Sequence, residues 1–174
     1  MMIKYFLILF FFLISVDTNS KVLMKIPEAL DLYFPNHEIR KKTLFLTDGA
    51  ISLLEDKAKS KFTNKIYTYY EIYKGNRRLN TAIMDTHILR SRTQTIFVVF
   101  DNKGKISSTE ILAFYEPGEY IMSKKWLDQF LGKNLKNKLI PRKDIARVSG
   151  ATISYNETTK AIRRTLSLYN YIYN

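Results

Sequence analysis

The stretch IFVVFDNKGKISSTEILAFY, residues 96–115, decides the fold of this chain. Its first five residues are all apolar, which is typical of a central β-strand that is buried on both faces. Asp101 to Gly104 then form a turn signal, and Lys105 to Tyr115 are predicted to continue as the next strand. A tight turn between two strands makes them antiparallel, so this region predicts a meander rather than a strand–helix–strand unit.

Two further strands are predicted upstream of this hairpin. Residues 66–73 (IYTYYEIY) are aromatic and β-branched, a composition that favours a strand. Lys74, Gly75 and Asn76 form a turn signal, after which residues 79–89 are predicted to return as the paired strand. The four segments together predict an antiparallel sheet.

Helices are predicted on either side of these strands. Pro27 to Phe34 can form a short amphipathic helix, and Thr47 is a good N-cap for a helix over residues 48–59. Ser123 can cap another short helix, which contains Trp126. These helices are expected to pack on the sheet.

The last helix is predicted to follow Ser154 and Glu157, which have the S-x-x-E spacing of a capping box. Lys160, Arg163 and Arg164 lie off its apolar stripe. The residues of that stripe recur at helical spacing and are Ala161, Ile162, Thr165, Leu166, Tyr169, Ile172 and Tyr173. The predicted fold class is therefore α+β, an antiparallel sheet with packed helices.

Composition excludes several kinds of chemistry. The chain has 174 residues and no Cys, which fits one domain and excludes disulfides, thiolate zinc sites and cysteine-ligated iron–sulfur clusters. His37 and His87 lie far apart in the sequence, which argues against a His-rich metal site. The 28 Lys and Arg outnumber the 16 Asp and Glu, and the net charge of +12 indicates an anionic partner.

The first twenty residues have the layout of a targeting segment. A short basic start precedes twelve apolar residues at 5–16, and residues 17–20 are polar. A cleaved secretory signal, a retained membrane anchor and a buried helix are the three interpretations. Either of the first two places the folded part outside the cytoplasm, in the periplasm or at the outer face of the cytoplasmic membrane. We expect residues 1–20 to be the signal or anchor and residues 21–174 to form a single domain.

The segment with the clearest chemical meaning is Ser149-Gly150-Ala151-Thr152, just before the last helix. Gly150 allows a backbone conformation that exposes N–H groups, and a helix N-terminus attracts anions. Ser154 adds a further hydroxyl. An ordinary turn that caps a helix is the alternative interpretation of the same residues.

This motif resembles that of the FMN-binding domain family, in which S-G-A-T is followed by a hydrophobic residue and Ser or Thr. The family includes flavin-carrying subunits of the sodium-translocating NADH:quinone reductase and of the Rnf complex. The resemblance implies FMN as the cofactor, attached to Thr152 by a phosphoester bond that an exported flavin transferase installs. Ser149, Gly150 and Ala151 would be the recognition motif.

The resemblance extends over roughly residues 43–170. Residues 112–120 and 126–130 are similar to a branch of small exported FMN-binding proteins, as is the region of Asp85 to Arg90. One position departs from the family pattern, because Ala146 stands where an Asp usually precedes the motif. Covalent attachment, non-covalent binding and a site without flavin therefore all stay open.

Four residues outside the motif are candidate flavin contacts, each with a structural alternative. Glu116 and Tyr120 either line the flavin pocket or hold their loop. Trp126 either stacks on the flavin or packs in the core. His87 either bonds to the cofactor or has a structural role. Arg90 and Arg92 are suited to bind phosphate, and a solvated strand end is the alternative interpretation.

The predicted function is that of an exported FMN-binding electron-transfer protein, rather than a turnover enzyme. Its expected partners are the flavin transferase during maturation and a membrane or extracytoplasmic redox protein. Basic residues 133–143 are expected to face anionic headgroups, and the export signal argues against nucleic acid. The alternatives are a non-redox interaction module that retains the fold without flavin, and a soluble flavin reductase.

Overall fold

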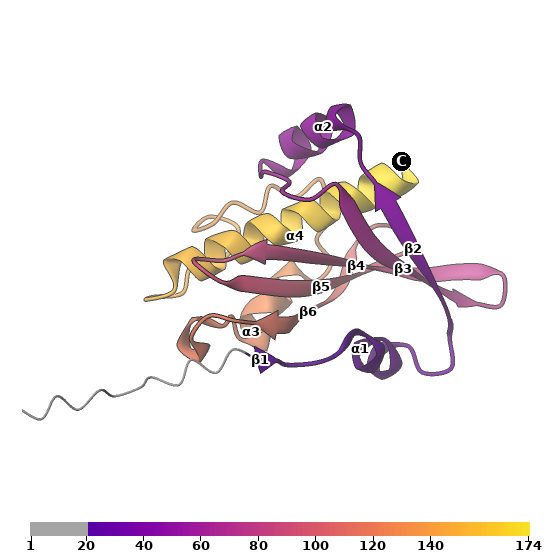
Figure 1. The fold of residues 1–174 in the computed structure, drawn as a ribbon, viewed down its shortest axis with the longest axis horizontal. Helices are drawn as coiled ribbons and strands as arrows, with labels where there is room; N and C mark the ends of the chain where they lie inside the picture. Colours follow the sequence, from indigo (N-terminus) through magenta and orange to yellow (C-terminus); the bar gives the residue numbers. More distant parts are fainter. Residues whose placement is uncertain (1–20) are drawn as a thin grey trace, which may run out of the picture.

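The computed structural model describes residues 21–174, which form one six-stranded antiparallel sheet and four α-helices (Figure 1). The strand order is β1-β6-β5-β4-β3-β2. The elements are β1 (Lys21–Val22), α1 (Ile26–Tyr33), β2 (Glu38–Phe45), α2 (Asp48–Ala58), β3 (Ile66–Lys74), β4 (Arg77–Ile88), β5 (Thr93–Asp101), β6 (Ile106–Phe114), α3 (Lys124–Leu127) and α4 (Thr152–Tyr173), with short 3₁₀ turns at Gly118–Tyr120 and Asp128–Phe130. The predicted α+β class is confirmed.

The proposed signal or anchor at residues 1–20 lies outside the described residues. Within residues 21–174, no helix is both long enough and apolar enough to cross a membrane.

Strand β5 is the centre of the fold, as its sequence predicts. It pairs with β4 on one side and β6 on the other. Ile96, Val98 and Phe100 pack in the core that contains residues of α2, α3 and α4. Phe97 and Val99 point to the opposite face, where they pack with residues of α1. Side chains alternate between the faces of a strand, so an unbroken apolar run serves both cores. Figure 1 shows α2 and α4 on one side of the sheet and α1 on the other.

The predicted turn between β5 and β6 is confirmed, and it packs against α4. Gly104 has a φ of 74°, and a Cβ atom added to it would lie 2.8 Å from Cε1 of Tyr169. The hydroxyl of Tyr169 donates a hydrogen bond to the carbonyl oxygen of Asp101 at 3.0 Å. This turn therefore ties the central hairpin to the second half of the long helix.

Strand β2 was not expected from the sequence. It contains Arg40, Lys41 and Lys42 in succession, a pattern without the apolar alternation of a half-buried strand. It lies at the edge of the sheet and pairs only with β3. An edge strand exposes much of its surface, and charges there discourage pairing with other molecules. Pairing with β3 rather than local pattern decides this element.

Helix α4 corrects two predictions. It begins at Thr152, with Ala151 as its N-cap, so Ser154 lies inside the first turn and does not form the predicted capping box with Glu157. Arg164 does not lie on an open side but is 6% exposed. The predicted stripe is buried as far as Tyr169, and Ile172 and Tyr173 are partly buried. Helix α2 also packs against α4 and thereby covers part of the helix that the sheet leaves free.

Candidate functional site

A pocket of about 310 Å³ opens at the start of α4. The turn after β4, the loop after β6 and the S-G-A-T motif meet there. The residues that line it are Leu89, Arg90, Glu116, Tyr120, Gly150, Ala151, Thr152, Ile153 and Ser154. The structure thus brings the motif together with Glu116 and Tyr120, which the sequence singled out from a distant loop. Ser149, the first residue of the motif, is exposed and directly precedes Gly150, but it does not line the pocket.

The motif leaves the first turn of α4 open. Gly150 has a φ of 78°, a conformation that glycine adopts at little cost. Ala151 supplies no side-chain cap. The first α-helical hydrogen bond runs from the N–H of Tyr155 to the carbonyl of Ala151, so the N–H groups of the preceding three residues have no acceptor within the helix. Together with the exposed hydroxyl of Thr152, they can bind an anion at this helix end.

Glu116 holds the turn between β4 and β5 in place. Its Oε1 accepts hydrogen bonds from the backbone N–H groups of Ser91 at 2.6 Å and Arg92 at 2.7 Å. Burial alone would raise the pKa of Glu116, but these N–H groups hold the pKa below its ordinary value. The carboxylate is therefore engaged with backbone while it also lines the pocket. Both interpretations of Glu116 are compatible with this position.

Arg90 brings a guanidinium group to the pocket. It is exposed, and its guanidinium carbon lies 5.7 Å from the centre of the Tyr120 ring. The turn that Glu116 holds begins with this arginine, so the buried carboxylate helps to fix where the guanidinium sits. A guanidinium and an aromatic ring at one pocket provide a partner for phosphate and a surface for a planar ring.

Trp126 lies in the core and does not line the pocket. Its ring is 6% exposed and packs edge-on against Phe130, at 5.4 Å between centroids. Its Nε1–H donates to the carbonyl of Ala146 at 2.7 Å, and the N–H of Ala146 donates to Gln129 at 2.7 Å. The structure thus favours the core interpretation of Trp126. The tryptophan anchors the chain three residues before Ser149.

His87 also lies away from the Thr152 pocket. Its Nδ1 is 2.9 Å from the Asp85 carboxylate, which accepts two hydrogen bonds from Arg164 at 2.6 and 2.8 Å. Burial alone would raise the pKa of Asp85, but Arg164 and His87 hold it below the usual range. Burial alone would lower the pKa of Arg164, but the Asp85 carboxylate outweighs burial and holds that pKa above its ordinary value. This cluster joins β4 to α4. The resemblance singled out the region of Asp85 to Arg90, but spacing within one segment does not reveal that Asp85 pairs with Arg164.

The pocket residues fit a flavin mononucleotide. Open N–H groups and Arg90 suit its phosphate, the Thr152 hydroxyl lies where that phosphate would be held, and Tyr120 offers an aromatic surface. The volume falls at the lower end of the range of small-molecule sites. An open helix end with an arginine beside it can therefore hold a phosphate-bearing cofactor.

The family comparison agrees with this geometry. The family model described as FMN-binding domain matches residues 91–167, so this segment is similar to that family, and the match supports FMN as the cofactor. The match spans β5, β6, α3, the motif and most of α4. Arg90 lies immediately before it. No curated protein and no solved structure matches the chain.

Proposed function

We propose that this protein is an electron carrier whose FMN is joined to Thr152 by a phosphoester bond. The observation that supports this proposal is the exposed Thr152 hydroxyl in the uncapped first turn of α4, beside Arg90 and Tyr120. Ser149, Gly150 and Ala151 are the motif that a flavin transferase would read. Exposure matters because the enzyme must reach the hydroxyl in the folded or folding chain.

Attachment joins Thr152 Oγ to the flavin phosphorus. The transferase would supply an activated flavin whose phosphate carries a leaving group. The hydroxyl loses its proton as the new O–P bond forms, and the bond between the phosphorus and the leaving group breaks. The remaining negative charge lies at the helix end, where open N–H groups and Arg90 stabilise it. Tyr120 provides a surface for the flavin ring. When bound, FMN supplies reversible reduction, while this chain fixes and orients it.

The electron donor and acceptor are expected on other proteins, because a chain without Cys has no thiolates to hold an iron–sulfur cluster. A membrane complex or an extracytoplasmic oxidoreductase is the proposed partner. Residues 1–20 would export the protein or anchor it outside the cytoplasm. The flavin transferase would act only during maturation.

The test is co-expression of the full chain with an exported flavin transferase, followed by intact-mass measurement of the denatured protein. The expected mass gain equals FMN less one water, with flavin fluorescence that survives a denaturing gel. Thr152→Ala should lose both signals. Thr63→Ala, which changes another exposed threonine outside the pocket, should keep them.

Other outcomes would select the alternatives. Flavin that is released on denaturation would overturn the phosphoester and leave a non-covalent flavoprotein, one of the outcomes that Ala146 at the usual Asp position leaves open. A protein without flavin would overturn the carrier and favour an interaction module that retains the fold.

A further inference from the structure

A second hollow of the surface, also of about 310 Å³, collects positive charge. It lies between the end of α2, the connector that precedes the motif, and the middle of α4. Its lining includes five cationic side chains and no carboxylate, and the cations are Lys57, Lys59, Lys136, Lys138 and Arg163. We call this hollow the basic groove. In an ordinary protein surface, charges of both signs are interspersed.

The cations of the basic groove are poorly compensated. Lys59 pairs with the exposed carboxylate of Asp56 at 2.6 Å. Among residues 21–174, no Asp or Glu oxygen lies within 4.0 Å of the charged nitrogens of the other four. Like charges that converge from three segments repel one another, and an anion between them removes that repulsion.

Arg163 shows the lack of compensating charge most clearly when it is compared with Arg164, the next residue. Arg164 is buried against the carboxylate of Asp85. Arg163 is partly buried, and burial lowers its pKa without any carboxylate to compensate. A partly buried guanidinium that lacks an acidic partner is suited to take one from a ligand.

The basic groove also has an apolar floor and a basic continuation. Leu135, Ile140 and Leu166 line it between the cations. An adjoining hollow shares Lys136 and Lys138 and adds further lysines, Lys133 and Lys143. The one carboxylate there, Asp144, accepts a hydrogen bond from the N–H of Ile140 at 2.9 Å and so is engaged within its own turn.

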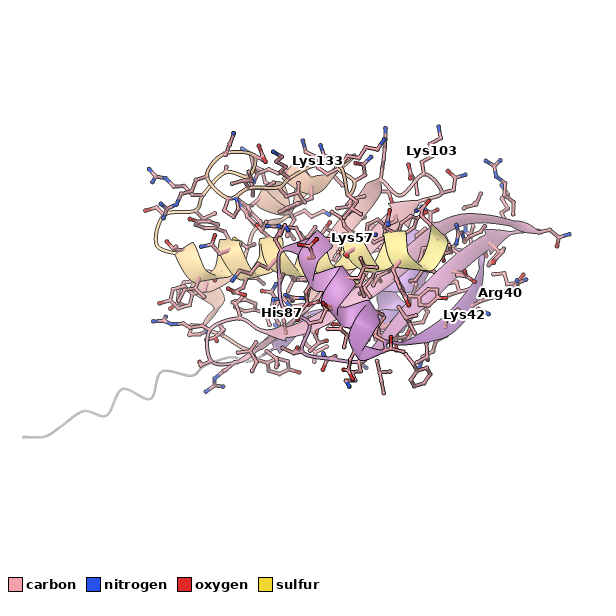
Figure 2. The ribbon with its side chains drawn as sticks, turned by 90° about the horizontal axis from the view of Figure 1, so that it is seen from above. Arg40, Lys42, Lys57, His87, Lys103 and Lys133 are labelled. Atoms are coloured by element: carbon pink, nitrogen blue, oxygen red, sulfur yellow. The ribbon has the colours of Figure 1, made fainter. Side chains whose placement is uncertain are left out.

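The basic groove lies apart from the basic residues of strand β2. In Figure 2, Lys57 lies on α2 where it crosses α4, and Lys133 lies along the upper edge, whereas Arg40 and Lys42 lie at the other side on β2. Arg163 follows Thr152 by eleven residues, which is roughly 16 Å along the helix axis. The basic groove is thus distinct from the Thr152 pocket.

We propose that the basic groove binds an anion that carries phosphate groups. A compact set of five cations calls for several negative charges in a small volume, and a phosphate monoester carries up to about two. Arg163 matches phosphate oxygens through its planar fork, and the lysines act as point charges around it. The phosphate comes either from a soluble compound or from a lipid headgroup, for which the apolar floor would accept adjoining carbon atoms.

The test compares two double variants of the full flavin-loaded chain. Lys136→Gln/Lys138→Gln removes two exposed charges from the basic groove, and Lys41→Gln/Lys42→Gln removes two exposed charges from β2 as a matched control. Titration calorimetry with inorganic tripolyphosphate measures the soluble source. Sedimentation with phosphatidylglycerol–phosphatidylcholine vesicles, against pure phosphatidylcholine vesicles, measures the lipid source.

Binding to either probe is expected in the parent and in the β2 variant. The groove variant should bind about twenty-five-fold more weakly, since each of the two lysines near an anionic surface contributes roughly a fivefold factor. Whichever probe binds identifies the source. Equal weakening in both variants would overturn the proposal in favour of net charge alone, and the absence of binding to both probes would overturn it outright. Flavin content should be unchanged in the groove variant, which separates this test from that of Thr152.

Discussion

The first turn of α4 and the middle of the same helix treat polar groups in opposite ways. At the start, Thr152 is exposed and the helix has no side-chain cap. Twelve residues further on, Arg164 is 6% exposed and its charge is met by Asp85. Buried polar groups need partners because their desolvation is costly, whereas an exposed helix end remains available to a ligand. The partnered Arg164 therefore holds the fold, whereas the open first turn at Thr152 is free to take a ligand.

Breaking the buried cluster should give the largest effect. Asp85→Asn leaves the Arg164 guanidinium without a counter-charge, and loss of one member of such a pair costs about 3–5 kcal/mol in free energy of unfolding. Urea denaturation of the variant measures this change. Asp48→Asn, whose ion pair with Lys65 is exposed, should change stability by less than about 1 kcal/mol. Similar losses in the two variants would contradict the distinction.

Acid should reduce the difference in free energy of unfolding between the parent and Asp85→Asn. The pKa of Asp85 is held below its ordinary value in the folded state, so its contribution is present above the unfolded pKa of about 3.9 and is lost as pH falls through the folded value. Urea titrations of both proteins at neutral pH, and at successively lower pH below the unfolded value, measure the gap. A gap that stays constant or widens on acidification would contradict the assigned role.

Two glycines sharpen the comparison at the level of the backbone. Both have positive φ, but a Cβ at Gly104 would meet the Tyr169 ring, whereas a Cβ at Gly150 would meet nothing within 4 Å. Gly104→Ala should lower the free energy of unfolding by about 1–3 kcal/mol. Gly150→Ala should cost about 1 kcal/mol, from its backbone conformation alone. Thermal unfolding of the two variants measures which one loses more stability. An equal loss in both would contradict the difference between the surroundings of the two glycines.

The smallest change in stability is expected at Thr152. Thr152→Ala alters an exposed side chain whose hydroxyl caps nothing, so the free energy of unfolding should move by no more than about 0.5 kcal/mol. Denaturation of the flavin-free proteins provides the measurement. A loss above 1 kcal/mol would show that the hydroxyl supports the fold and would weaken its assignment to a ligand.

The sequence predicted those parts of the molecule that depend on local pattern. The apolar run at residues 96–100 indicated a strand with two buried faces, and Asp101 to Gly104 indicated its turn. The charged edge strand β2 was missed because pairing with β3, rather than its own pattern, determines it. Pattern also placed Arg164 away from the core, since the periodicity of one helix does not reveal that α2 covers a second side.

The candidate site was predictable to a similar extent. The motif at Ser149 to Thr152 is continuous in the sequence and was recognised there, as were Glu116 and Tyr120 through their loop. The start of α4 was placed three residues late, because a capping-box pattern at Ser154 competed with the true N-cap at Ala151. The link from Trp126 to Ala146 and the pairing of Asp85 with Arg164 join distant segments, which spacing within one chain segment cannot show.

The central claim is that the exposed end of α4 holds the flavin through one hydroxyl, and peptide mapping tests it most directly. Trypsin can cleave after Arg147 and Lys160, which releases residues 148–160 from protein matured with a flavin transferase. Fragmentation of that peptide should place the flavin phosphate on Thr152. Flavin phosphate on Ser149, on Ser154 or on a different peptide would contradict the account, as would an unmodified peptide from flavin-loaded protein.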